Sequence, residues 1–219
     1  MARRRLDREH RDWSRWAHPT LREAVTSPAV WRLSAPYFLM GVTSYALSLW
    51  LPLLLRDVAG VADSQMGWVL LAVGGASAVG MLLLGWHSDR SGERVGHAAA
   101  TLGVAAIGCT LAAVVREPLV IIGGLTLAMG GSIAFLPVFW CLPPRLLTGG
   151  AVAGGIALIN SLGNLGGFVG PNILGLVREH TAGFTAGLLT LGGLSLAAAL
   201  LMLWLHRAPA AEPGIHVTR

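Results

Sequence analysis

Gly154-Gly-Ile-Ala-Leu-Ile-Asn-Ser-Leu-Gly-Asn-Leu-Gly-Gly-Phe-Val-Gly-Pro171 is an uncharged segment that nevertheless contains two Asn, one Ser and six Gly. In an α-helix of roughly 100° per residue, Asn160 and Asn164 lie on one face, about 40° apart. A stripe of glycines lies beside this face, and in lipid such a stripe lets two helix backbones meet. A bulky residue at Gly167, which belongs to the stripe, should therefore block the close approach of a second helix. The stripe consists of two Gly-x-x-x-Gly pairs, Gly163/Gly167 and Gly166/Gly170. We therefore predict a membrane-spanning helix with one closely packed face.

The two asparagines of this helix allow two interpretations. A side-chain amide in hydrocarbon needs a hydrogen-bond partner, so stacked amides indicate the interior of a bundle or a water-filled cavity. They would either line a passage for a polar solute or hold neighbouring helices together, since polar side chains serve both roles in membranes. The spacing alone favours neither.

The composition indicates a membrane protein. The chain is 54% hydrophobic and 12% charged, with a mean hydropathy of +0.63, whereas soluble domains are about 25% charged. Its arginines lie mostly outside the apolar segments, and acids dilute those of the N-terminal region, which argues against a nucleic-acid partner. Cys109 and Cys141 lie within apolar runs and are interpreted as packing residues. We predict no disulfide, metal site or cofactor.

Six apolar segments are long enough to cross about 30 Å of hydrocarbon. We expect an all-α membrane fold with a basic tail (1–30), a six-helix membrane domain (31–206) and a short tail (207–219). Short connections predict antiparallel neighbours. The predicted spans are Trp31–Leu55, Met66–Gly85, His97–Val115, Pro118–Leu142, Ala151–Val177 and Gly183–Leu205.

The arginines predict the orientation. An even number of spans places both termini on one side of the membrane. If that side is the cytoplasm, thirteen arginines lie there and only Arg56, Arg116 and Arg178 lie on the other side. The positive-inside rule then predicts a multi-pass protein of a bacterial inner (plasma) membrane with both termini cytoplasmic.

Hydroxyl side chains mark one face of the first span, within about 100° of arc. Such a stripe faces protein or water rather than lipid, and two tyrosines are bulky for a tight seam, which favours a cavity wall. The stripe consists of Ser34, Tyr37, Ser44, Tyr45 and Ser48. The third and sixth spans are apolar all round and are predicted to be lipid-facing supports.

The fourth span is interrupted by Pro137. A mid-helix proline removes a backbone hydrogen bond and predicts a kink, and kinked helices form sites in transporters. Trp140 follows within one turn. It would either stack on a ligand at the kink or belong to the aromatic belt at the membrane surface.

The loop after the second span, Gly85-Trp-His-Ser-Asp-Arg-Ser-Gly-Glu-Arg94, is the most charged short loop in the chain. It would be a solvated turn, or a latch in which Asp89 caps the N-terminus of a neighbouring helix while the arginines pair with acids. His87 and His97 lie at the same end of the spans and lack the spacing of a zinc pair.

Taken in order, these segments resemble the C-terminal half of a major facilitator superfamily transporter, within its anion:cation symporter family. The resemblance covers nearly the whole chain. The loop resembles the superfamily's loop signature, and the other segments resemble the end of the tenth helix, the eleventh helix and the start of the twelfth. These are Gly85-x-x-x-Asp89-Arg90-x-Gly92-x-Arg94, Phe139-Trp140-x-Leu-Pro143-Pro144, Gly155 to Pro171, and Phe184-Thr-Ala-Gly-Leu188.

This resemblance implies one half of a twelve-helix fold, built from two inverted three-helix units, with the substrate between the halves. It implies proton-driven transport of a small organic anion, such as an aromatic or sugar-derived carboxylate. The partners would be the lipid bilayer and a complementary six-helix half or a second copy. The substrate-binding residues would be Tyr37, Ser44, Tyr45, Trp140, Asn160 and Asn164, and the conformational latch would be Gly85, Asp89, Arg90, Gly92 and Arg94.

Two departures from the family keep other functions open. The chain has six spans rather than twelve, and no Asp or Glu lies inside any of them, although buried carboxylates are the usual proton carriers. A truncated fragment that does not transport, or a membrane protein that binds a partner, is the alternative. The spans contain no catalytic set of residues, so we predict no enzyme activity.

Overall fold

The structure, a computed structural model, describes residues 21–147 and 151–207. Most of the predicted tail 1–30 and nearly all of the tail 207–219 therefore lie outside the described residues. Within these two ranges every regular element is a helix. The helices are α2 (Leu21–Thr26), α3 (Pro28–Asp57), α4 (Asp63–Ser91), α5 (Val95–Val114), α6 (Pro118–Phe139), α7 (Pro143–Leu146), α8 (Ala151–Thr181) and α9 (Thr185–Arg207).

Six of these helices are long and apolar enough to cross a membrane, which confirms the six predicted spans. Two of them, α3 and α6, begin at a proline, whose fixed φ suits the first helical position and whose missing N–H would be unpaired there anyway. The largest boundary difference is in α4, which continues six residues beyond Gly85 to Ser91. Much of the predicted loop is therefore helical.

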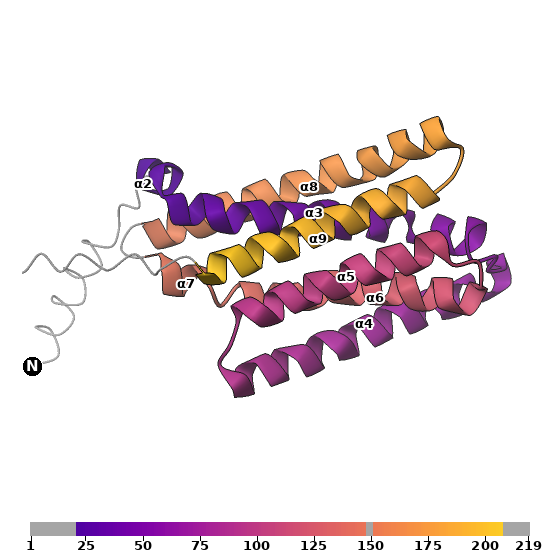
Figure 1. Cartoon of the computed structure of the whole chain (residues 1–219), viewed down its shortest axis with the longest axis horizontal. Helices are drawn as coiled ribbons and strands as arrows, with labels where there is room; N and C mark the ends of the chain where they lie inside the picture. Colours follow the sequence, from indigo (N-terminus) through magenta and orange to yellow (C-terminus); the bar gives the residue numbers. More distant parts are fainter. Residues whose placement is uncertain (1–20, 148–150, 208–219) are drawn as a thin grey trace, which may run out of the picture.

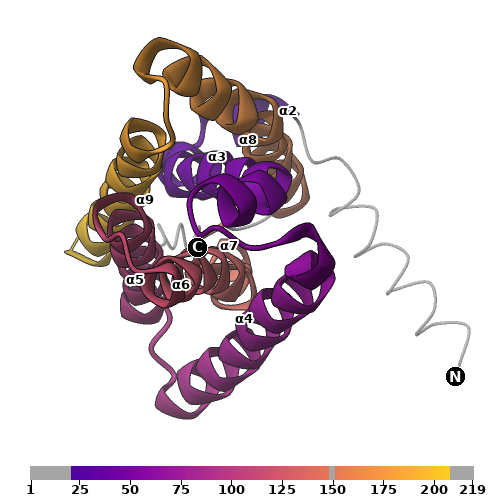
Figure 2. The ribbon, with the colours of Figure 1, turned by 90° about the vertical axis from the view of Figure 1, so that its right-hand side faces the viewer.

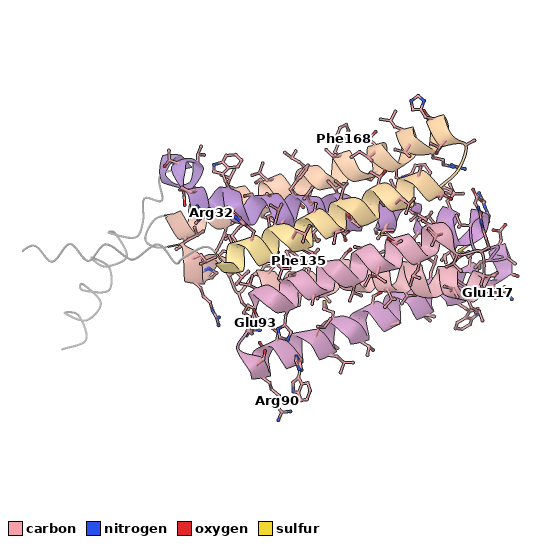
Figure 3. All side chains as sticks on the ribbon, in the orientation of Figure 1. Arg32, Arg90, Glu93, Glu117, Phe135 and Phe168 are labelled. Carbon is pink, nitrogen blue, oxygen red and sulfur yellow. The ribbon has the colours of Figure 1, made fainter. Side chains whose placement is uncertain are left out.

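The long helices lie side by side in one bundle (Figure 1). We call the end where α3 begins and α9 ends the tail end, and the opposite end the far end. Both described ends of the chain lie at the tail end, as an even number of spans requires. Arg32, Arg90 and Glu93 lie at the tail end and Glu117 at the far end (Figure 3). The charged groups labelled in that view thus occupy the two ends of the bundle.

The helices form two three-helix units, α3–α4–α5 and α6–α8–α9, with matching contacts. α3 packs against α8 and α9 of the second unit, and α6 packs against α4 and α5 of the first. α3 also contacts α6, and α5 contacts α9. Exchanging α3 with α6, α4 with α8 and α5 with α9 therefore maps these contacts onto one another, as expected for inverted repeats, although the smaller α3–α4 and α8–α9 contacts have no counterpart of similar size.

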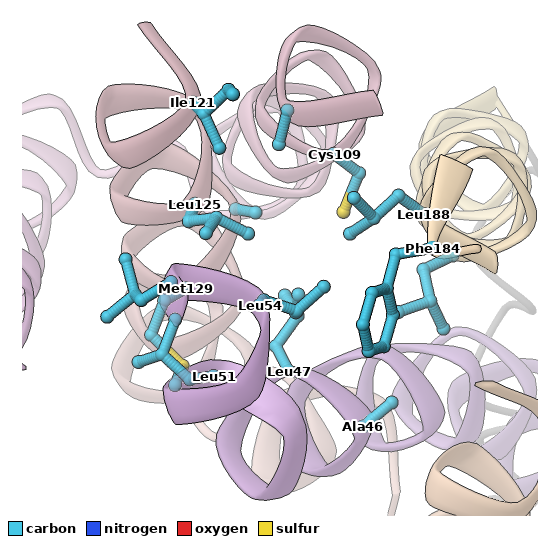
Figure 4. Close-up of a cluster of buried hydrophobic side chains, with 14 of the residues drawn as sticks. Ala46, Leu47, Leu51, Leu54, Cys109, Ile121, Leu125, Met129, Phe184 and Leu188 are labelled. Carbon is cyan, nitrogen blue, oxygen red and sulfur yellow. The ribbon is translucent and has the colours of Figure 1, made fainter. Parts of the chain in front are cut away.

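Viewed from the far end, the bundle has two different sides (Figure 2). α5 and α9 lie together on one side, and α4 and α8 flank α3 and α6 on the other. Between them, buried side chains of α3, α5, α6 and α9 fill the far half of the core (Figure 4). Cys109 belongs to this cluster as a free, fully buried thiol, which confirms its interpretation as a packing residue.

The third span is more than a lipid-facing support. A Cβ atom on Gly131 of α6 would lie 2.5 Å from the carbonyl oxygen of Thr101 and 2.7 Å from the amide nitrogen of Ala105. A Cβ on Gly124 would lie 2.8 Å from the carbonyl oxygen of Gly108. Small residues on both helices thus bring the α5 and α6 backbones into contact. In the most apolar 18-residue stretch of α5, 56% of the residues are buried inside the bundle.

Candidate functional site

The glycine stripe of α8 packs directly on α3. A Cβ on Gly166 would lie 2.6 Å from the amide nitrogen of Val42, and one on Gly170 would overlap the Val42 carbonyl. Gly41 of α3 meets the backbone of Gly163 in the same way. The stripe therefore has the close-packing role that its spacing predicts, and its partner is the first span.

This close approach aligns two tyrosines of α3 with the two asparagines of α8. The Tyr45 hydroxyl donates to Oδ1 of Asn164 at 3.0 Å, and the Tyr37 hydroxyl donates to Oδ1 of Asn160 at 3.4 Å. Both asparagines are exposed, and within the described residues their Nδ2 groups have no hydrogen-bond partner. The amides thus hold two helices together and also present free N–H donors, so the two interpretations are compatible.

Aromatic rings at the end of α6 surround Tyr37, the buried tyrosine of the two Tyr–Asn pairs. The Tyr37 ring stacks on Phe139 with centroids 4.9 Å apart and meets the Trp140 ring edge-on at 5.1 Å. The fully buried Phe135 lies behind them, 6.4 Å from Tyr37. Three predicted site residues, Tyr37, Trp140 and Asn160, are therefore neighbours, with the Tyr45–Asn164 pair farther toward the far end.

The rest of the predicted hydroxyl stripe does not join this group. Ser44 is half-buried and has no hydrogen bond to any described residue. Ser34 is buried and donates to the Val30 carbonyl of its own helix at 2.8 Å. Ser48 is exposed. The stripe is therefore not one continuous polar surface.

The structure contains polar links that the sequence reasoning missed. Buried Ser195 of α9 donates to Oγ1 of Thr43 at 3.1 Å, and Thr43 donates to the Leu191 carbonyl at 3.4 Å. Thr43 is outside the predicted stripe, and Ser195 is a single hydroxyl in an apolar span, so neither gave a periodic signal. Trp50 of α3 donates from Nε1 to the Pro171 carbonyl of α8 at 3.2 Å.

The charged loop at the tail end is a folded unit. Gly92 ends α4 with a φ of 69°, a left-handed conformation that favours glycine. Asp89 accepts from Nη2 of Arg94 at 2.5 Å, and Nη1 of Arg94 donates to the Ser88 hydroxyl at 3.0 Å. Arg90 lies over the Trp86 ring, 4.6 Å from its centroid. A Cβ atom added at Gly85 would have no neighbouring atom within 4 Å.

The acid that caps a helix in this loop is Glu93, whereas Asp89 makes no capping contact among the described residues. The latch of Asp89 onto a helix of a complementary half stays a prediction. Glu93 accepts from the backbone amides of Gly96 at 2.6 Å and His97 at 3.0 Å. It lies two residues before the start of α5, next to the N-cap residue Arg94, and the first N–H groups of a helix have no partner inside it. Asp89 lies instead in the last turn of α4 and pairs with Arg94.

Two histidines extend the Glu93 contacts. His97 Nδ1 lies 2.8 Å from the Glu93 carboxylate, and His97 Nε2 lies 2.7 Å from His87 Nδ1. Partial burial works to raise the pKa of Glu93, but the Gly96 amide and the contacts with His97 outweigh it, so this pKa lies below its ordinary value. In the described part of the chain, no cluster of three His, Cys, Asp or Glu residues has the geometry to hold a metal ion.

Comparisons with known proteins give a family match and several similar proteins. Residues 33–218 match the family model described as Major Facilitator Superfamily. A protein of Agrobacterium vitis named "Putative tartrate transporter" is 37% identical over 176 residues, which are 80% of this chain and 39% of the relative. A "Quinolone resistance transporter" of Acinetobacter baumannii is 34% identical over 182 residues, 83% of this chain and 42% of the relative.

A further relative is the "Inner membrane transport protein RhmT" of Escherichia coli (strain K12). It is 34% identical over 190 residues, which are 85% of this chain and 43% of that protein. The chain therefore spans about two fifths of the length of the curated relatives it matches.

Proposed function

Because the chain belongs to the major facilitator superfamily, we propose that it supplies the C-terminal half of a proton-coupled symporter for a small organic carboxylate. The order and spacing of the loop signature and of the last three spans support the assignment to the C-terminal half of an anion:cation symporter. The tartrate in the name of one relative supports a sugar-derived carboxylate as the substrate.

The observation that carries this proposal is the pair of Tyr–Asn hydrogen bonds on the α3–α8 wall. Each asparagine uses Oδ1 to accept from a tyrosine, so its Nδ2 donors are left for another partner. A carboxylate only accepts hydrogen bonds, and two amide donors on one wall match that chemistry. The acids of α3 and α8, Asp57 and Glu179, lie near the far end of these helices, away from the amides.

The proton carrier belongs to the complementary half in this proposal. Among the described spans, acids occur only near helix ends, at Asp57, Asp63, Asp89 and Glu179. Proton carriers in membrane transporters are commonly buried carboxylates or histidines. Coupling to protons in this proposal therefore relies on an ionisable group of the complementary half that faces the Tyr–Asn wall.

The side of the bundle flanked by α4 and α8 is the proposed interface with that second half. In the most apolar 18-residue stretch of each helix, only 11% of the residues of α4 and 22% of those of α8 are buried inside the bundle. The corresponding share is half or more in α3, α5 and α6. Gly67, Gly74 and Gly75 of α4 have open space where a side chain would be, which leaves room for a helix to approach closely. A complementary six-helix half fits this surface and the greater length of the relatives.

Cysteine accessibility tests the proposed wall. In a Cys109→Ser/Cys141→Ser background in membranes, Asn160→Cys and Asn164→Cys should react with a membrane-impermeant maleimide, and tartrate should slow the reaction. Leu196→Cys, on an exposed position of α9, is the control and should stay unreactive. If positions 160 and 164 are sealed from both aqueous sides, the wall does not line a solute passage.

Uptake experiments separate the half-transporter from the alternatives. Proteoliposomes that hold the chain together with a six-helix N-terminal half should take up labelled tartrate when the outside is acidic, and Asn164→Ala should reduce that uptake. Uptake by the chain alone would instead indicate an assembly of two copies. Absence of uptake in both preparations would favour a fragment that binds a partner and transports nothing.

A further inference from the structure

The far end of the bundle contains a cavity of about 280 Å³ that is separate from the Tyr–Asn wall. Its lining comes from the end of α3, the α5–α6 connection, the end of α8 and the α8–α9 connection. Pockets for small molecules span roughly 300–1,000 Å³, so this cavity lies just below that range and suits only a small ligand. The lining residues that matter for its chemistry are Asp57, Arg116, Arg178, Phe184 and Thr185.

The charges around the cavity leave an excess of cations. The Asp57 carboxylate is already shared, because Oδ1 accepts from Nε of Arg56 at 3.1 Å and Oδ2 accepts from Nη2 of Arg178 at 3.3 Å. Arg116 also lines the cavity and has no hydrogen-bond or ion-pair partner among the described residues. The acids next to these arginines in the sequence, Glu117 and Glu179, are not part of the lining.

The position of Arg178 is fixed before any ligand arrives. Its guanidinium lies 4.6 Å from the centroid of the Phe184 ring and 5.6 Å from that of Trp50. The two rings meet edge-on at 5.8 Å and hold each other in place. A cation held by two aromatic faces and one carboxylate loses little freedom when it binds an anion, which favours affinity.

Membrane topology does not account for this gathering of arginines. The sequence assigns only three arginines to the far end of the bundle, and they come from three different connections. Two of them line the cavity, and the third, Arg56, pairs with the Asp57 carboxylate that also lines it. We propose that this cavity is a binding site for a small oxyanion, a carboxylate or phosphate group held between Arg116 and Arg178.

A soluble anion and a lipid headgroup share this chemistry, and two measurements distinguish them. The first is calorimetric titration of the full chain, in nonionic detergent at low salt, with succinate and with inorganic phosphate. Saturable binding should become about tenfold weaker or worse in Arg116→Gln, since a charge-assisted hydrogen bond is lost. Arg145→Gln, an exposed arginine of α7 at the tail end, is the matched control and should bind like the parent chain.

The second measurement counts phosphatidylglycerol molecules retained by the chain after extraction from vesicles of phosphatidylglycerol and phosphatidylcholine. Arg116-dependent retention without binding of succinate or phosphate would assign the site to a lipid headgroup. Arg116 is exposed and has no hydrogen-bond or ion-pair partner in the described part of the chain, so Arg116→Gln should keep the parent's thermal unfolding midpoint. Equal binding by Arg116→Gln and the parent chain, or no binding in either measurement, would overturn the site.

The outcome is independent of the proposed transport. Asn164 lies on the Tyr–Asn wall, away from the far-end cavity. Asn164→Ala should therefore leave anion binding at the far end unchanged, whatever its effect on uptake. If Asn164→Ala abolished the titration signal and Arg116→Gln did not, the bound anion would lie at the Tyr–Asn wall and the far-end site would be refuted.

Discussion

The Tyr45 hydroxyl donates a 3.0 Å hydrogen bond to Oδ1 of Asn164 across the interface of α3 and α8. The ring reaches the amide because the residue three positions after Asn164 is a glycine. A Cβ on Gly167 would lie 3.3 Å from the Tyr45 ring, a tight contact. Gly167 therefore makes room for a side chain that forms the polar wall, whereas Gly166 and Gly170 make room for the backbone at Val42.

We predict that Tyr45→Phe lowers the free energy of unfolding by about 0.5–1.5 kcal/mol, the usual net worth of one hydrogen bond. The ring and its packing are retained, so the loss reports on the hydroxyl. The measurement is thermal or denaturant unfolding in detergent, combined with Asn164→Ala in a double-mutant cycle. If the two substitutions are simply additive, the hydroxyl and the amide do not interact in the folded chain.

The glycine stripe gives a second prediction with internal controls. Gly166→Ala and Gly170→Ala should each destabilise the chain by about 1–3 kcal/mol, because the new methyl group meets the backbone at Val42, which cannot move away cheaply. Gly167→Ala meets only the movable Tyr45 ring and should cost less. Gly193→Ala on α9, with open space around it, should be stabilising by about 0.5–1 kcal/mol through helix propensity. Equal costs at positions 166, 167 and 170 would contradict this packing.

The sequence was sufficient for features that depend on one helix at a time. Hydropathy located the six spans, and the Gly-x-x-x-Gly spacing identified the packing face of α8, since both patterns are local. The partner of that face was not predictable, because a glycine stripe does not specify which helix packs on it. The pairing of Tyr37 with Asn160 depends on the register of two helices whose paired residues are 123 positions apart, and a single sequence contains no signal for it.

Which acid of the charged loop caps α5 depends on where α4 ends. The second span was predicted to end at Gly85, but α4 continues to Ser91 and ends at Gly92. This places Asp89 inside the last part of α4, where its carboxylate pairs with Arg94. Glu93, beyond the turn, is then the acid that precedes α5. A glycine that can adopt a positive φ was the available signal for this boundary.

The Asp89–Arg94 pair should be important for the stability of the loop. The Arg94 side chain is only 12% exposed and donates to both Asp89 and Ser88. Arg94→Gln should therefore destabilise the chain by about 1.5–3 kcal/mol, as expected for a hydrogen-bonded charge. Arg90→Gln, which loses an exposed contact with the Trp86 ring, should cost about 1 kcal/mol or less. Unfolding midpoints of both variants test this, and a larger effect at Arg90 would refute it.

The Glu93 cap predicts a specific dependence of stability on pH. Its pKa in the folded chain is below the ordinary value of 4.5, so the carboxylate stabilises the fold fully above that value. The contribution is lost as the pH falls from 4.5 through the lower folded pKa. Glu93→Gln should cost about 1 kcal/mol at neutral pH, as for other caps. It should also flatten the decline of the unfolding midpoint between neutral and acidic pH.

Glu117 provides the matched control for this prediction. It occupies the residue before α6 but makes no side-chain capping hydrogen bond. Glu117→Gln should therefore leave both the neutral-pH midpoint and its acid decline close to those of the parent chain. The Glu93 cap is disproved if the parent chain and Glu93→Gln lose stability in parallel on acidification, because the folded and unfolded chains would then bind protons at position 93 equally well.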